Sequence, residues 1–250
     1  MSDNVAVTGM VIGITHFNDY DRRVVLLTKE RGKITAFAQG ARRQNSQLLA
    51  RTQLFAFGTF IVSEGKNAYK LHSAEIMNYF ESISKDPAKL CYASYFLEMA
   101  SYYAKENNNE VELLKLVYQT LRIMVKDVIP LALIRAIYEL RIFVVNGEYP
   151  ECFHCVRCQS KENLLHFSPL RSGVLCNDCL SEPGQLFYVS PSTLYTMQYI
   201  IASSIERLYT FNVSEDVLHE LQRVTMHYID EKIDRPFKSM EVLEFMEDFH

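Results

Sequence analysis

Apolar positions follow two different periods along the chain, and the change occurs near residue 85. In the first 80 residues, short apolar and β-branched runs are separated by polar turns, two of which contain glycine. Runs of this length and composition are typical of β-strands. Five short strands without a long helix predict a small closed barrel, for which the OB-fold is the expected example and an SH3-like barrel the alternative. The five predicted strands cover residues 5–14, 23–28, 33–38, 55–63 and 68–76.

After residue 85, apolar residues recur at spacings of three and four, as one buried helical face requires. Asp86 and Pro87 form a good helix start, because a carboxylate can accept bonds from free N–H groups and proline fits the first turn. The buried face of this helix is expected to contain Leu90, Ala93, Leu97 and Ala100. Further helices are predicted over 111–126, 131–147, 190–203, 214–233 and 238–249.

Four cysteines form two C-x-x-C pairs that are separated by 17 residues. A two-residue gap lets both thiolates of a pair turn toward one point, and two pairs complete a tetrahedron around Zn²⁺. The predicted ligands are Cys155, Cys158, Cys176 and Cys179. Four thiolates close the coordination shell, so the predicted role of the zinc is structural. A disulfide-bonded pair or a redox C-x-x-C is the alternative.

Three other side chains could compete as ligands, namely Cys152, His154 and His166. The four paired cysteines already fill the shell, so Cys152, like Cys91, is expected to act as a small apolar residue. Six cysteines in 250 residues are too few for a disulfide scaffold. The N-terminus has no signal-like segment, and no run approaches the roughly 18 apolar residues that cross a bilayer. These features predict a cytoplasmic protein with reduced thiols and no membrane association.

Motifs for catalysis are missing from the sequence, and the protein is expected not to be an enzyme. A zinc deaminase would carry H-x-E before P-C-x-x-C, but none of the seven histidines is followed two residues later by glutamate. The sequence also contains no H-E-x-x-H, no phosphate-binding G-x-x-x-x-G-K-[ST] and no G-x-S-x-G.

Charge is distributed unevenly along the chain. The formal net charge is −4, but residues 1–80 hold ten Lys/Arg and six Asp/Glu, a net charge of +4, which leaves −8 for the remainder. A basic module on an acidic body is the asymmetry expected when one module meets a polyanion. The basic candidates for contact with nucleic acid are Arg22, Arg23, Lys33, Arg42, Arg43, Arg51, Lys66 and Lys70. A solvated rim of the barrel is the alternative interpretation.

Aromatic side chains between these cations could stack on bases, as in proteins that bind single strands. Tyr20, Phe37 and Tyr69 are the candidates for stacking. In contrast, Phe55, Phe57 and Phe60 are concentrated in one strand and are expected in the core.

The order of these parts resembles the RecO family of bacterial DNA-repair proteins. The resemblance is carried by G-K-I-T-A-F-A-Q-G-A-R-R in the barrel, R-A-I-Y-E-L-R-I-F-V-V-N-G-E-Y-P before the cysteines, the cysteine pairs, and D-R-P-F-K-S-M near the end. It covers nearly the whole chain. It implies an α+β, multi-domain protein in which an N-terminal five-stranded OB-fold barrel is followed by a helical domain with an inserted four-cysteine zinc finger. The corresponding segments here are an OB-fold over 1–80, helical parts over 81–148 and 186–250, and the zinc finger over 149–185.

The resemblance also implies a function. RecO proteins are non-enzymatic recombination mediators that bind single- and double-stranded DNA, anneal complementary strands and help to load RecA onto strands coated by single-strand-binding protein (SSB). RecR is the usual partner, and the expected location is the bacterial cytoplasm, in association with the nucleoid. Arg42 and Arg43 match the family's G-A-R-x motif, and Cys155, Cys158, Cys176 and Cys179 match its zinc ligands.

The family also binds the acidic, apolar C-terminal tail of SSB on its helical body. Such a site needs an apolar pocket beside a cation, and Arg135, Tyr138 and Arg141 are the candidates. Two solvated arginines on an amphipathic helix are the alternative. Three rival functions stay open at this stage: a zinc-finger scaffold whose barrel binds a protein partner, a zinc hydrolase or nucleotide-modifying enzyme, and a finger that itself reads DNA.

Overall fold

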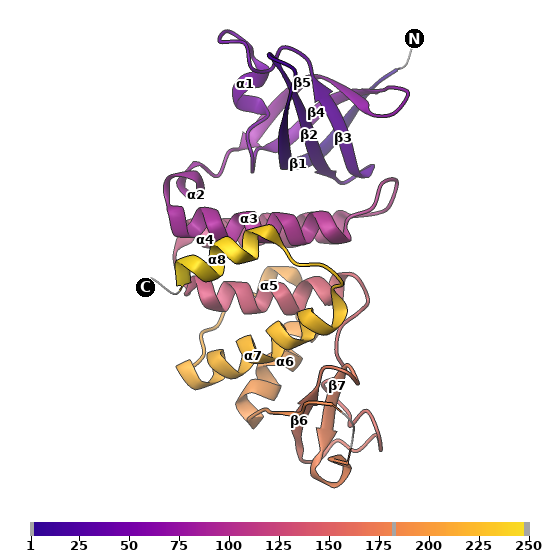
Figure 1. Ribbon diagram of the computed structural model, residues 1–250, viewed down its shortest axis with the longest axis vertical. Helices are drawn as coiled ribbons and strands as arrows, with labels where there is room; N and C mark the ends of the chain where they lie inside the picture. Colours follow the sequence, from indigo (N-terminus) through magenta and orange to yellow (C-terminus); the bar gives the residue numbers. More distant parts are fainter. Residues whose placement is uncertain (1–2, 182–183, 248–250) are drawn as a thin grey trace. The chain divides into compact units, whose positions relative to one another are not determined.

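The structure is a computed structural model that describes residues 3–181 and 184–247 (Figure 1). The chain divides into two compact units, one formed by residues 1–125 with 237–250 and the other by residues 126–236. Parts of the predicted segments 1–80, 149–185 and 186–250, and the end of the predicted helix 238–249, lie outside the described residues. The domain boundaries expected from the sequence stay a prediction.

The first unit begins with a closed five-stranded barrel in the order β1-β2-β3-β5-β4. Neighbouring strands are antiparallel except β3 and β5, which pair in parallel. This closed order is that of the OB-fold, so the expected fold is confirmed in place of the SH3-like alternative. The strands are β1 (Asn4–Phe17), β2 (Asp21–Thr28), β3 (Gly32–Ala38), β4 (Phe57–Glu64) and β5 (Tyr69–Asn78).

The barrel closes because β1 is long enough to pair with two strands. Its first half pairs with β4 and its second half with β2, and an irregularity between Val11 and Gly13 bends the strand between the two partners. Along β3 every second residue is buried, because alternate side chains of a strand point to opposite faces. The barrel core contains Val7, Val24, Leu26, Ile34, Phe60 and Val62 among others.

In the described part of the first unit, four helices follow the barrel strands and the short α1 (Leu48–Arg51). They are α2 (Glu81–Lys85), α3 (Pro87–Tyr103), α4 (Val111–Lys126) and α8 (Lys238–Glu247). The sequence pattern predicted neither α1 nor the short α2. On α3, Ala93, Leu97 and Ala100 are buried as expected, whereas Leu90 is exposed and its predicted burial is wrong. The helix contacts both β1 and α8, and Leu90 lies in its first turn, outside the buried face.

Glu98 of α3 receives the beginning of α8. Its carboxylate accepts the backbone N–H of Lys238 at 3.3 Å and that of Ser239 at 2.9 Å. A negative charge at a helix N-terminus is favourable, because the first N–H groups have no partner within the helix. The segment that resembles the family's closing motif therefore starts a helix that packs on α3.

The cap of α3 gives a first prediction. The Asp86 carboxylate accepts the backbone N–H of Lys89 at 3.1 Å, as the sequence predicts. We expect Asp86→Ala to lower the free energy of unfolding by about 1 kcal/mol, since one N–H at the helix start loses its acceptor. Chemical denaturation measures the change. Asp86→Asn keeps an acceptor and should lose much less, whereas equal losses for the two variants would contradict the capping role.

In the described part of the second unit, three α-helices pack against one another: α5 (Leu131–Val145), α6 (Pro191–Ala202) and α7 (Glu215–Lys232). Buried residues occupy every position of α5 from Leu133 to Leu140, so this helix has no broad solvated face. Ser190 caps α6 by accepting the Thr193 N–H at 3.2 Å. Ser214 precedes α7 as predicted, but its hydroxyl makes no capping bond.

The cysteine-containing segment forms a small three-stranded sheet in the order β7-β6-β8. Its strands are β6 (Leu164–Ser168), β7 (Gly173–Cys176) and β8 (Phe187–Tyr188), and a 3-10 turn (Asn177–Cys179) follows β7. Phe167, Val174 and Leu175 are fully buried. The sheet shares the core of the helices, because the Phe167 ring packs edge-on against that of Tyr228 on α7 at 5.8 Å.

Candidate metal centre and candidate nucleic-acid interface

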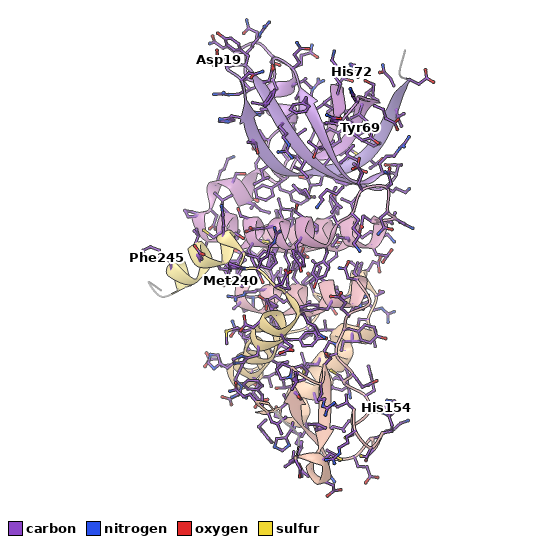
Figure 2. All side chains as sticks on the ribbon, turned by 45° about the vertical axis from the view of Figure 1, so that its right-hand side comes forward. Asp19, Tyr69, His72, His154, Met240 and Phe245 are labelled. Atoms are coloured by element: carbon purple, nitrogen blue, oxygen red, sulfur yellow. The ribbon has the colours of Figure 1, made fainter. Side chains whose placement is uncertain are left out.

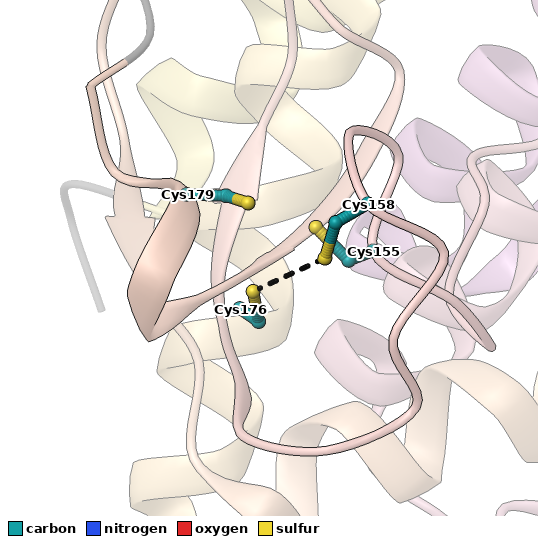
Figure 3. A group of neighbouring side chains, drawn as sticks. All are labelled: Cys155, Cys158, Cys176 and Cys179. Carbon is teal, nitrogen blue, oxygen red and sulfur yellow. Dashed lines mark hydrogen bonds between the residues drawn. The ribbon is translucent and has the colours of Figure 1, made fainter.

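The two cysteine pairs come together at one point of the second unit (Figure 3). The four Sγ atoms lie within 4.8 Å of one another, and those of Cys158 and Cys176 are 3.6 Å apart. Zn–S bonds of about 2.3 Å in a tetrahedron place the sulfurs roughly 3.8 Å apart, close to this spacing. The donor set therefore fits a tetrahedral thiolate site, of the soft type that suits zinc or an iron–sulfur centre.

Local backbone bonds build the first half of this cluster. The Cys155 N–H donates to Ser160 O at 2.8 Å, and the Gln159 N–H donates to Cys155 O at 2.9 Å, so the chain turns tightly between the two cysteines. Gln159 takes a positive φ of 64° to complete the turn. The Val156 N–H donates to Val174 O of β7, which fixes the turn beside the second half of the cluster.

Gly173 allows this close approach. A side chain at this position would place Cβ 2.5 Å from Val156 Cγ1 and 2.6 Å from Glu151 O. Residue 151 forms an isolated parallel bridge with Gly173, so the chain before the first cysteine lies directly against β7. Glycine is needed at position 173 because the backbone of Glu151 and the side chain of Val156, both near the first cysteine pair, leave no room for a Cβ atom.

The cysteine thiols differ in how readily they ionise. Burial would raise the pKa of Cys155, but backbone hydrogen bonds from Cys158, Cys176 and Arg157 stabilise its thiolate and lower the pKa to about 6. Burial, followed by the neighbouring Cys176 thiol, raises the pKa of Cys179 to about 12. The Cys155 thiol thus ionises more readily than that of Cys179, and a bound cation would favour the thiolate form of the other cysteines.

The rival ligands lie outside the cluster. Among the described residues, the four paired cysteines are the only group of His, Cys, Asp or Glu found close enough to hold a metal. Cys152 is fully buried, and burial raises the pKa of its thiol, as expected for a small apolar residue. His154 (labelled in Figure 2) lies 3.6 Å from a carboxylate oxygen of Glu151, and the His166 ring lies edge-on to Tyr188.

On the barrel, cross-strand pairing aligns several of the predicted residues. Thr15 pairs with Arg23, Arg23 with Phe37, and Phe37 with Lys70, so one row crosses β1, β2, β3 and β5. Directly opposed residues share one face of a sheet. Arg23 and Lys70 are exposed and Phe37 is half-buried between them. We call this row, with the adjacent Phe17, Tyr20, Arg42 and Arg43, the basic–aromatic face.

Arg42 and Arg43 owe their position to Gly40. The φ of Gly40 is +66°, and its N–H donates to the Asp21 carboxylate at 2.7 Å, which turns the chain sharply after β3. Ala41 is buried as an anchor, and both arginines that follow are exposed. The guanidinium of Arg43 lies over the Tyr20 ring, 5.5 Å from its centroid.

The aromatic members differ from the expectation. Tyr20 is 56% exposed and lies in the β1–β2 turn. Its neighbour in sequence, Asp19, is labelled in Figure 2. Tyr69 is only 8% exposed and belongs to the barrel core, so its predicted stacking role is wrong. Phe17 was missed: it is 46% exposed and its ring centroid is 4.9 Å from that of Phe37. Its place two residues after Thr15, on the same face of β1, is the signal that identifies it.

Phe55 and Phe60 are buried as predicted. Phe57 is only half-buried and packs against Tyr118 of α4, with ring centroids 4.5 Å apart. Phe55 precedes β4 and takes a positive φ of 70°.

Two predicted cations have structural roles. Arg22 alternates with Arg23 and points to the opposite face, where its Nη1 donates to Leu49 O at 2.8 Å and Thr52 Oγ1 at 2.9 Å. Burial, followed by the charge of Arg42, lowers its pKa. Lys33 Nζ donates to Ser101 O of α3 at 2.5 Å. Both side chains are used within the fold, and their predicted contact with DNA stays a prediction.

The two remaining cations lie apart from the row. Lys66 is exposed in the β4–β5 turn. Arg51 is half-buried on α1 and lines a surface pocket over β4 and β5 with Glu75 and Tyr79.

The three candidates for binding an acidic tail are also used within the fold. Tyr138 is 0% exposed. Arg135 Nε donates to the Glu139 carboxylate at 2.8 Å inside the second unit, and Thr225 donates to the other oxygen of that carboxylate. Arg141 donates to the carbonyls of Ile200 and Ile201 at the end of α6. Tyr138 is therefore inaccessible from the surface, and a tail site at Arg135 and Arg141 stays a prediction.

In the part of the chain that the structure describes, no helix has the length and apolar character to span a bilayer.

Comparison with known proteins matches nearly the whole chain. The family model described as "Recombination protein O N terminal" matches residues 1–80, and that described as "Recombination protein O C terminal" matches residues 84–241. The chain is 31% identical over 242 residues to a protein of Acetivibrio thermocellus named "DNA repair protein RecO", with 96% of each chain covered. Proteins of the same name from Alkaliphilus metalliredigens and Bacillus subtilis are 30% and 28% identical, over 95% and 96% of this chain and 98% and 93% of theirs.

Proposed function

Since the chain belongs to the recombination protein O family, we propose that it is a non-enzymatic DNA-binding mediator of recombination that anneals complementary single strands. Curated members of this family are named DNA repair proteins, which supports a role in DNA repair. The finer proposal adds that it helps to load RecA onto single strands coated by SSB. The proposal assigns no catalytic residue.

The observation that carries the proposal is the basic–aromatic face. In OB-folds, oligonucleotides bind across strands 2 and 3 and along the β1–β2 and β4–β5 loops. Here these elements carry Arg23, Phe37, Tyr20 and Lys66. A row of exposed cations can follow a phosphate backbone, and the intervening rings can stack on bases of any sequence.

These residues support annealing in a simple physical way. Each exposed arginine or lysine that meets a phosphate releases a condensed counterion, which favours binding without regard to sequence. Neutralising two backbones lowers their mutual repulsion and raises the local concentration of strands. Base pairing then supplies the driving force, so no bond needs to be broken by the protein.

For the cysteine cluster we propose Zn²⁺ in a structural role. Cys155, Cys158, Cys176 and Cys179 would hold it, and four thiolates leave no open position for a substrate or water. When bound, the ion would link the first turn to β7 and so stabilise the small sheet of the second unit.

The family supports further proposals on partners and location. These are double-stranded DNA, the SSB tail, RecR, a functional link to RecA, and a place in the bacterial cytoplasm with the nucleoid. The buried positions of Tyr138 and Arg135 favour a tail site elsewhere than these α5 residues.

Strand annealing tests the proposal. We expect the protein to accelerate annealing of complementary strands, both when they are bare and when they are coated with SSB. SSB that lacks its C-terminal tail is the control and should reduce annealing of coated strands only. If bare strands anneal no faster with the protein, and it shows no affinity for DNA, the mediator function is wrong and a protein-binding scaffold is favoured.

A further inference from the structure

The four cysteines of the cluster differ in their access to solvent. Cys155, Cys176 and Cys179 are buried, whereas Cys158 is exposed. Cys158 lies in the tight turn between two further exposed residues, Arg157 and Gln159. A small reagent from solution therefore reaches Cys158 before the other three sulfurs.

A second sulfur is placed to react with the first. Cys158 Sγ lies 3.6 Å from Cys176 Sγ, as the dashed line in Figure 3 shows. A disulfide needs about 2.05 Å between sulfurs, so a shift of roughly 1.5 Å closes the bond. Cys176 ends β7 and Cys158 lies in a turn on the other side of the cluster, so this bond would join the two halves of the site.

We propose that Cys158 is a site of oxidation by hydroperoxides and that its oxidation yields a Cys158–Cys176 disulfide, which dismantles the metal centre. In the first step the Cys158 sulfur attacks the peroxide, an S–O bond forms, the O–O bond breaks, and the leaving oxygen becomes water or an alcohol. In the second step Cys176 attacks the sulfenic sulfur, an S–S bond forms, and hydroxide leaves as water. Two electrons pass from the sulfurs to the peroxide.

The consequence for the metal follows from the donor count. Two of four thiolates are consumed, and the remaining pair, Cys155 and Cys179, cannot fill a tetrahedral shell. The three-stranded sheet is also held by contacts that do not involve the metal. Phe167, Val174 and Leu175 stay buried, and the Tyr228 hydroxyl donates to Glu148 O at 2.6 Å. Oxidation should therefore release the ion and loosen the cysteine loops while the helices stay folded.

The chain offers a direct way to identify the disulfide. Trypsin cleaves after Arg141, Arg157, Lys161, Arg171 and Arg207, so Cys158 lies alone in peptide 158–161, Cys155 lies in 142–157, and Cys176 lies in 172–207. Cleavage before Asp178 then separates Cys176 from Cys179. Mass spectrometry of the zinc-loaded full-length protein, treated with hydrogen peroxide, assigns the bond.

We expect release of one zinc ion per chain, measured with a chromogenic chelator, together with a peptide that links Cys158 to Cys176. A thiol reductant with added zinc should restore the metal content. A Cys155–Cys158 or Cys176–Cys179 bond, zinc that stays bound, or protein that never binds zinc would overturn the proposal.

Two histidine variants test the role of exposure. Cys158→His keeps four donors, since sites with three cysteines and one histidine also bind zinc. In hydrogen peroxide this variant should release zinc at least about tenfold more slowly than the unchanged protein, because oxidation follows thiol exposure. Cys155→His changes a buried predicted ligand and should stay sensitive to hydrogen peroxide.

Equal rates of zinc release from the two variants would contradict the role of Cys158. If a variant fails to bind zinc, the peptide assignment in the unchanged protein still decides. The readouts involve no DNA, so failure of the mediator function leaves this test intact.

Discussion

Reversal of Arg42 and Arg43 to glutamate is expected to weaken binding of single-stranded DNA and to flatten its dependence on salt. Both guanidinium groups are exposed beside Tyr20, on the turn that Gly40 makes after β3. Loss of two phosphate contacts should reduce the slope of log affinity against log salt by about 1.4 and the affinity by at least about tenfold near 0.1 M salt. The double charge reversal adds repulsion to this loss.

Fluorescence anisotropy with a labelled oligonucleotide, repeated from about 50 to 200 mM salt, measures both quantities. Lys85→Glu with Arg122→Glu is the matched control, because it makes the same change in net charge at exposed positions of α2 and α4. Arg22→Ala is a second control and should lower stability through its lost bonds to Leu49 and Thr52 while leaving the salt slope nearly unchanged. An Arg42/Arg43 variant with unchanged affinity and slope would remove the basic–aromatic face from the proposal.

Replacement of Cys176 and Cys179 by serine is expected to abolish metal binding and to disorder the loops around the cluster. Structural zinc contributes about 10–16 kcal/mol in isolated zinc-finger peptides. The effect on this protein should be smaller, because the buried residues of β6 and β7 pack with the helices and hold part of the sheet without metal. The barrel belongs to the other unit, so its affinity for DNA should be retained.

Metal analysis, the spectrum of the cobalt-substituted protein and hydrogen exchange over residues 153–180 measure these effects. Cys91→Ser removes a thiol outside the cluster and should change none of them. A cobalt spectrum without four thiolates would contradict the ligand set. Loss of DNA binding in the cysteine variant, with the barrel still folded, would show that the zinc finger reads DNA.

Local sequence signals proved accurate where the deciding contacts are close along the chain. The predicted helix over 111–126 coincides with α4, and its apolar residues Leu113, Leu116 and Leu121 are fully buried. Asp86 and Ser190 cap their helices through N–H groups three residues ahead. Each C-x-x-C pair converges through a local turn, whereas the two pairs meet through the Val156 N–H bond to Val174 O and the bridge between Glu151 and Gly173.

The sequence did not show which long side chains have partners that are distant in sequence. Lys33 donates to a carbonyl 68 residues away and Arg141 to one 59 residues away. Composition alone marks such residues as solvated cations, since their apolar stems and charged ends fit either setting. Tyr69 shows the same limit for aromatics, because its burial depends on which face of β5 points into the barrel.

The sequence by itself indicated the barrel, the long helices, the four-cysteine cluster and the family, because strand period, helix period, caps and cysteine spacing are all properties of neighbouring residues. Only the tertiary structure decided which cations are exposed. The closed register places Arg23, Phe37 and Lys70 in one row, whereas packing directs Arg22, Lys33 and Arg135 to partners within the fold. The physical reason is that a charge is stabilised by whichever partner the fold brings near it, and that partner is set by the whole chain rather than by adjacent residues.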